Sequence, residues 1–184
     1  MSPTTLSIAH WIVALTYLRL LAGAGRAFKP VKRNGGTLPL MLTFIGMIAA
    51  SRRSELSALL ALPALAILVG ALALFQWAAH SIRGKFFSYI GSRDTPQFVF
   101  QEGPFAYVRH PFYTSYMLTH LAVALAYLGW LTSAIALASF VVLWRAAAFE
   151  EGKFASSPNA AEYRAYVSRT GRFVPKFQAS KLLA

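Results

Sequence analysis

The stretch LSALLALPALAILVGALALFQWAA, residues 56–79, decides the fold class. It carries no charged residue, and as a helix it would extend about 36 Å, enough to cross a hydrocarbon core of about 30 Å. Near its end, Gln76, Trp77 and His80 are residues that suit a membrane–water interface. Pro63 lies near the start, where a transmembrane helix tolerates a kink. The stretch therefore predicts a membrane-spanning helix.

Working outward, four more apolar runs follow the same pattern; they are residues 6–24, 38–50, 111–127 and 131–149. The run 38–50 is short for a span, so it is either a thinned or tilted crossing or a re-entrant segment, and we favour the crossing. Gly129 and Trp130 form a turn that makes the last two runs a helical hairpin. We predict an all-α integral membrane protein with about five transmembrane helices in one structural domain.

Composition agrees with this class. Of the 184 residues, 57% are hydrophobic and only 13% are charged, and the net charge is +12. The basic residues lie in the gaps between apolar runs, which is typical of cytoplasmic loops and not of a nucleic-acid-binding face. With five crossings, most basic residues fall on one side if the C-terminus is cytoplasmic and the N-terminus is outside. If residues 38–50 do not cross, the N-terminus moves inside.

Some chemistries are excluded. Cysteine is absent, which removes disulfides, thiolate zinc sites and a cysteine nucleophile. The histidines His10, His80 and His120 show no metal-ligand spacing, so we predict no metal site. A glycine-rich phosphate loop is also missing, so any cofactor pocket is of another kind.

The first candidate cluster is the stretch GPFAYVRHPFY, residues 103–113. Pro111 suits the first turn of a helix, where its missing amide has no helical partner. Arg109 and His110 would then lie at the helix N-terminus, which attracts anionic groups. The alternative is an interfacial helix start with aromatic residues and a snorkelling arginine.

Two more clusters follow. Glu150 and Glu151 are adjacent carboxylates at the end of an apolar run, where they need a cation or water; they could hold a cationic ligand or form a solvated helix end. Residues 159–167 predict a short amphipathic helix, with Asn159 and Glu162 spaced as a capping box. Tyr163 and Tyr166 on its apolar face are predicted to pack and not to catalyse.

Taken in order, these clusters resemble the superfamily of isoprenylcysteine carboxyl methyltransferases and phospholipid methyltransferases. The resemblance rests on a Gly-Pro-aromatic turn, Arg109-His110-Pro111-x-Tyr113, a two-span hairpin, Glu150-Glu151, and a Tyr-x-x-Tyr helix followed by Pro175. It covers roughly residues 97–177. Residues 81–184 would then be the cofactor-binding catalytic region, and residues 1–80 an N-terminal group of transmembrane helices.

The resemblance implies S-adenosylmethionine as the cofactor. The residues that match the cofactor-binding positions of the family are Gln97, Phe98, Val99, Phe100, Phe105, His110, Pro111, Phe112, Tyr113, Glu150 and Glu151. Arg109, Arg145 and Glu150 are the predicted catalytic residues, with either arginine orienting an anionic acceptor. The chain departs from the family at Gln97, where a histidine is usual, at Ser115, where glycine is common, and at Ala146, which replaces a substrate-linked arginine.

The predicted activity is methyl transfer to an amphipathic or lipidic acceptor, either an isoprenylcysteine-type carboxylate or a phospholipid amine. A carboxylate is already ionised at neutral pH, whereas an amine must first lose a proton. Membrane lipids are the expected partners, and nucleic acid is not. Two alternatives remain, an NADPH-dependent membrane reductase of the sterol-reductase type and a non-catalytic lipid-binding protein.

Overall fold

The computed structural model describes residues 3–27, 37–82 and 98–176. These form six α-helices and one short 3-10 helix, and no strand occurs within these ranges. The helices are α1 (Pro3–Ala27), α2 (Thr37–Ser51), α3 (Ala61–Ser81), α4 (Pro111–Tyr127), α5 (Trp130–Ala155) and α6 (Ala160–Arg169), with η1 (Gly103–Ala106) between α3 and α4. The all-helical prediction is confirmed for the described part.

Three helices, α1, α3 and α5, are long and apolar enough to cross a membrane. Less than a third of each apolar window is buried inside the protein, so their apolar side chains largely face outward, as lipid contact requires. Helix α2 and the 17-residue α4 are shorter than the other three. The protein is thus a helical membrane protein, while the count of five crossings stays a prediction.

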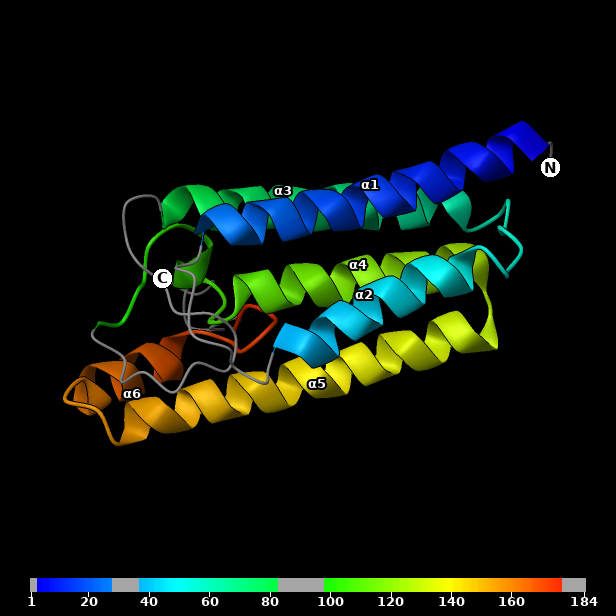
Figure 1. The fold of residues 1–184 in the computed structure, drawn as a ribbon. Helices are drawn as coiled ribbons and strands as arrows, with labels where there is room; N and C mark the ends of the chain where they lie inside the picture. Colours follow the sequence, from blue (N-terminus) through cyan, green and yellow to red (C-terminus); the bar gives the residue numbers. More distant parts are fainter. Residues whose placement is uncertain (1–2, 28–36, 83–97, 177–184) are drawn as a thin grey trace.

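Helix α4 is the centre of the bundle. Eleven of its 17 residues are buried, whereas the 26-residue α5 buries four. It packs against α3 on one side and α5 on the other, with α1 lying along α3 and α2 along α5 (Figure 1). Because its neighbours shield α4, it meets protein more than lipid.

The predicted start of the third run at Leu56 is wrong. Helix α3 begins at Ala61, and residues 55–60 form turns and irregular structure. This loop is held in place by Ser57, whose amide donates to the Ala126 carbonyl of α4 (2.7 Å) and whose hydroxyl accepts from the Leu60 amide (3.3 Å). Pro63 therefore lies in the first turn of α3, where it removes no helical hydrogen bond and needs no kink.

Most other helix starts agree with the sequence, but α5 runs from Trp130 to Ala155, six residues past the predicted end at Phe149, so Glu150 and Glu151 lie within the helix. Helix α4 begins at Pro111 with His110 as its N-cap, and Gly129 precedes α5 as predicted. Helix α6 begins after Asn159, but the predicted capping box is wrong, because Asn159 makes no side-chain capping bond and Glu162 accepts from Gln101 (2.8 Å). The Glu162 carboxylate thus bonds a side chain distant in sequence, Gln101, and not the Asn159 amide that a capping box requires.

The segments that carry the predicted site residues gather at one end of the bundle. Residues 98–110, α6 and residues 170–176 lie beside the first turn of α4 and the last turns of α5 (Figure 1). The opposite end carries the loop 52–60 and the turn between α4 and α5. We call these the polar end and the loop end of the bundle.

Candidate functional site

The N-terminus of α4 is held by backbone pairing with the C-terminal segment. The Arg109 amide donates to the Gly171 carbonyl (2.8 Å), and the His110 amide donates to the Arg172 carbonyl (3.2 Å). Gly171 returns a bond to the Tyr107 carbonyl (3.3 Å), which makes a short parallel bridge between Val108 and Gly171. Residues more than sixty positions apart are therefore fixed against each other at the helix start.

Glu151 is the centre of an ionic network at this helix start. Its carboxylate accepts from Arg109 Nε (3.0 Å), from His110 Nε2 (3.1 Å), and from Arg172 through Nε (3.0 Å) and Nη2 (2.6 Å). The Arg172 contact is a bidentate pair, the strongest common geometry for such an interaction. Only 13% of the Glu151 side chain is exposed. Two arginines thus neutralise Glu151 and join α4, α5 and the C-terminal segment.

Arg109 and Arg172 also make contacts away from Glu151. Arg109 donates to the Thr170 carbonyl (2.6 Å), and the Arg172 guanidinium lies 4.8 Å from the centre of the Trp144 ring. Hydrogen bonding to Glu151 raises the pKa of Arg172 above its already high value, so it stays charged at any physiological pH. Arg172 is therefore a lasting positive charge beside Glu151.

Glu150 has different surroundings although it is the next residue. It accepts a hydrogen bond from the Tyr113 hydroxyl and lies 3.7 Å from His110 Nδ1. The His110 and Tyr113 rings stack at 5.2 Å and 12°. Neither contact carries a permanent positive charge, and 24% of the Glu150 side chain is exposed. Glu150 is therefore more exposed and less neutralised by these contacts than Glu151.

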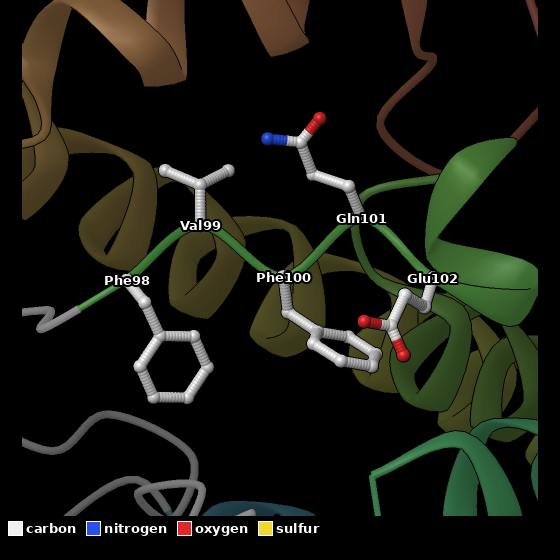
Figure 2. Close-up of a pocket in the computed structure, with 5 residues that line it drawn as sticks. All are labelled: Phe98, Val99, Phe100, Gln101 and Glu102. Carbon is white, nitrogen blue, oxygen red and sulfur yellow. The ribbon is translucent and has the colours of Figure 1, made fainter.

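Residues 98–102 line a cavity of about 500 Å³ at the same end of the bundle, a size within the range of small-molecule sites. The chain is extended here, and Figure 2 shows the rings of Phe98 and Phe100 on one side, with Val99 and Gln101 on the other. Val99 packs with Tyr163 and Tyr166 of α6. The Phe100 and Phe105 rings pack edge to face, with their centres 5.0 Å apart. The cavity wall is thus anchored to both α6 and η1.

Helix α6 holds this wall through its tyrosines and polar side chains. The Tyr166 hydroxyl donates to the Phe105 carbonyl (2.6 Å), and Tyr163 stacks on Phe154 at 4.1 Å. Burial raises the pKa of Tyr166 to about 12, and burial also raises the pKa of Tyr163. Both hydroxyls stay protonated at neutral pH, so neither serves as a base, in agreement with a packing role.

The structure brings together five predicted site residues from separate segments: Arg109, His110, Tyr113, Glu150 and Glu151. Pro111 occupies the first helical position, and Phe112 packs on Phe105, which links α4 to the cavity wall. Arg145 is exposed on α5 outside this network. Gln97 lies outside the described residues.

Sequence reasoning missed Arg172, because it counted this residue only among the basic residues of the C-terminal tail. It also missed Gln101, which bonds both Glu162 and Arg169 of α6. No local pattern marks either residue. The structure shows that a Cβ at Gly171 would collide with the Val174 carbonyl oxygen. A glycine beside Arg172 is the feature of the sequence that agrees with this close approach of backbone.

A family model of phospholipid methyltransferases matches residues 59–157. The chain belongs to this family. The match covers α3, α4 and α5 and includes Arg109, His110, Tyr113, Glu150 and Glu151, whereas α1, α2, α6 and Arg172 lie outside it. Comparison with curated proteins and with solved structures yields no match. Family membership makes this chain a membrane methyltransferase and confirms the superfamily that the motifs predicted.

Proposed function

We propose that the chain transfers a methyl group from S-adenosylmethionine to an amphipathic or lipidic acceptor at the membrane interface. The observation that carries the proposal is that Arg109, His110, Tyr113 and the Glu150–Glu151 pair meet at one end of the bundle, inside the region matched to phospholipid methyltransferases. We place the C-terminal end on the cytoplasmic side, with five crossings. A soluble cofactor would then enter from the cytoplasm, and the acceptor from the bilayer.

The residues present fit this cofactor. S-adenosylmethionine supplies an activated methyl group on a positively charged sulfur, together with an amino group and ribose hydroxyls. Glu150 offers a carboxylate that is 24% exposed and contacts Tyr113 and His110, and the nearby cavity of about 500 Å³ has an aromatic wall. We assign cofactor contact to Glu150, His110, Tyr113 and the wall of Phe98, Val99 and Phe100.

Glu151 is better suited to positioning than to ligand contact. Its oxygens already accept four hydrogen bonds from protein side chains, so a ligand would have to displace an arginine or His110. By holding His110 from the Nε2 side, Glu151 orients the ring that stacks on Tyr113 and faces Glu150. We therefore propose Glu150 as the cofactor contact of the pair.

The chain's own residues contribute mainly geometry. Methyl transfer is an in-line displacement, which is accelerated by holding two reactants in one orientation and by excluding water. Arg109 is 8% exposed and bonded to Glu151 and Thr170, so orienting an anionic acceptor would require it to leave these partners. Arg145 is exposed on α5 and lies outside the Glu151 network, so it would not have to break that network to reach an acceptor. We propose Arg145 as the residue that orients an anionic acceptor.

The test is calorimetric titration of detergent-purified protein with S-adenosylhomocysteine. We expect wild type to bind and Glu150→Gln to bind about tenfold more weakly, because a charge-assisted hydrogen bond contributes about 1.5–3 kcal/mol. His110→Ala should weaken binding as well. Glu55→Gln is the matched control, because Glu55 is an exposed carboxylate at the loop end.

Binding that is lost selectively in the Glu150 and His110 variants would support the site. Methyl-labelled cofactor, offered with a prenylcysteine analogue or with phosphatidylethanolamine vesicles, would then identify the acceptor class. Absence of binding in folded wild type, or binding of NADPH in its place, would refute the proposal. Equal affinity of Glu150→Gln and Glu55→Gln would refute the assignment of Glu150.

A further inference from the structure

An apolar crevice of about 150 Å³ lies at the loop end of the bundle, between α1, α3 and α4. Its lining is apolar apart from the Tyr127 hydroxyl and includes Leu56 of the loop, Ala64 of α3 and Ala126 of α4. Ala64 and Val123 are almost fully buried at its wall. The α4 residues of the crevice lie about 17–24 Å along the helix from Pro111, so the crevice is not part of the candidate methyl-transfer site.

Two polar features accompany the crevice. Tyr127 is the last residue of α4, is 2% exposed, and has a hydroxyl without a hydrogen-bond partner among the described residues. Arg52 and Arg53 are exposed on the loop that also supplies Leu56, where Glu55 offsets part of their charge. This end of the bundle thus combines an apolar space with a small excess of positive charge at a helix terminus.

We propose that the crevice binds a segment of one acyl chain of an anionic diacyl phospholipid, whose phosphate pairs with Arg52 and Arg53. Water does not fill an apolar space of this kind, and around a membrane protein the alternative occupant is a lipid chain. The lipid phosphate and ester groups lie at the membrane interface, which is also the depth expected for a helix terminus with tyrosine and arginine. The bound lipid is distinct from any methyl acceptor, because it occupies the other end of the bundle.

Tyr127 has a smaller part in this site. Its side chain lines the crevice, but its hydroxyl oxygen is covered by neighbouring atoms. It reaches a lipid ester carbonyl only after a movement of the ring, so we expect its contribution to be modest. The apolar volume and the arginines are the main determinants.

The test measures lipid retention by native mass spectrometry of detergent-purified protein titrated with dioleoylphosphatidylglycerol or dioleoylphosphatidylcholine. Ala64→Leu fills the crevice and should weaken phosphatidylglycerol binding at least tenfold. Ala66→Leu is its matched control, because Ala66 is exposed on the same helix. Arg52→Gln and Arg53→Gln should each weaken binding about fivefold for phosphatidylglycerol only, since one basic residue near an anionic headgroup contributes about that factor. Arg164→Gln, an exposed arginine on α6, is the control for charge.

Ala126→Leu fills the same crevice from α4 and replaces Ala64→Leu if the latter does not fold. Tyr127→Phe should weaken binding about twofold for ester-linked lipid and leave dialkyl-ether lipid unchanged. Equal binding by crevice-filling variants and by Ala66→Leu would overturn the proposal. Equal retention of the two lipid classes by wild type would overturn it too, because the arginine contact would then be absent. Cofactor binding is a separate readout, so failure of this site leaves the proposed activity untouched.

Discussion

The polar end and the loop end of the same helical bundle are built from different interactions. At the polar end, Glu151 is surrounded by Arg109, His110 and Arg172, and the segment 170–173 is bonded to the start of α4. At the loop end, the apolar crevice is closed by alanine, leucine and valine side chains, and the Tyr127 hydroxyl has no partner in the described part of the chain. The polar end is therefore specified by an ionic network of side chains, whereas the crevice at the loop end is specified mainly by packing.

This difference predicts how each end responds to substitution. Directional bonds between buried charged groups fail abruptly when one partner is removed, because the others are left desolvated and unpaired. Where apolar packing dominates, removing a polar atom that has no partner changes the free energy of unfolding only slightly. Four substitutions, ordered by expected effect, examine this contrast through thermal unfolding of the protein in lipid-free detergent.

Glu151→Ala should have the largest effect. It removes the one carboxylate shared by Arg109, His110 and Arg172, and breaking such a buried pair costs about 3–5 kcal/mol in the free energy of unfolding. Glu55→Ala, an exposed carboxylate at the loop end, should change stability by less than about 0.5 kcal/mol. Similar midpoints for the two variants would contradict the central role of this network.

Gly171→Ala should have the next largest effect and lower the free energy of unfolding by about 2–3 kcal/mol. An added Cβ would collide with the Val174 carbonyl oxygen, and backbone cannot move aside as a flexible side chain can. The shift would also draw Arg172 away from Glu151. Gly152→Ala is the matched control, because a Cβ there meets nothing within 4 Å and alanine favours the helix; it should raise the midpoint slightly.

Tyr166→Phe should lower the free energy of unfolding by about 1–2 kcal/mol, because it removes the hydroxyl that donates to the buried Phe105 carbonyl. Tyr107→Phe removes a hydroxyl from a tyrosine that is 57% exposed and should be nearly neutral. If the two variants unfold at the same temperature, α6 is not held to η1 by this bond.

Tyr127→Phe should have the smallest effect, within about 0.5 kcal/mol of wild type, although Tyr127 is as buried as Tyr166. Its hydroxyl has no partner to lose in the described structure, and removing an unsatisfied buried group is neutral or stabilising. A destabilisation as large as that of Tyr166→Phe would mean that the Tyr127 hydroxyl itself makes a stabilising hydrogen bond.

Much of the fold could be predicted from local sequence. Apolar runs located α1, α2, α4 and α5, Pro111 marked the start of α4, and Gly129 marked the turn before α5. The start of α3 was misplaced because the apolar residues 56–60 form a loop that hydrogen-bonds to α4 through Ser57 and Ala126. The predicted capping box is absent, and the Glu162 carboxylate accepts from Gln101 instead. Both errors arise from partners distant in sequence.

The site could be predicted in part. Motif order pointed to Arg109, His110, Tyr113 and the glutamate pair, and these residues do lie together. The different surroundings of Glu150 and Glu151 had no signal in the sequence, because adjacent identical residues differ only through what packs against them. Arg172 was unpredictable for the same reason.

The sequence by itself determined that this protein is helical, belongs in a membrane and resembles membrane methyltransferases. These properties depend on the apolar character of continuous segments and on short motifs, which need no knowledge of neighbours. Only the tertiary structure decided that α4 is the central helix, that Glu151 is neutralised by Arg109 and Arg172, and that a crevice opens at the loop end. Those features depend on contacts between residues tens of positions apart, because burial and charge pairing are set by the packing of whole helices.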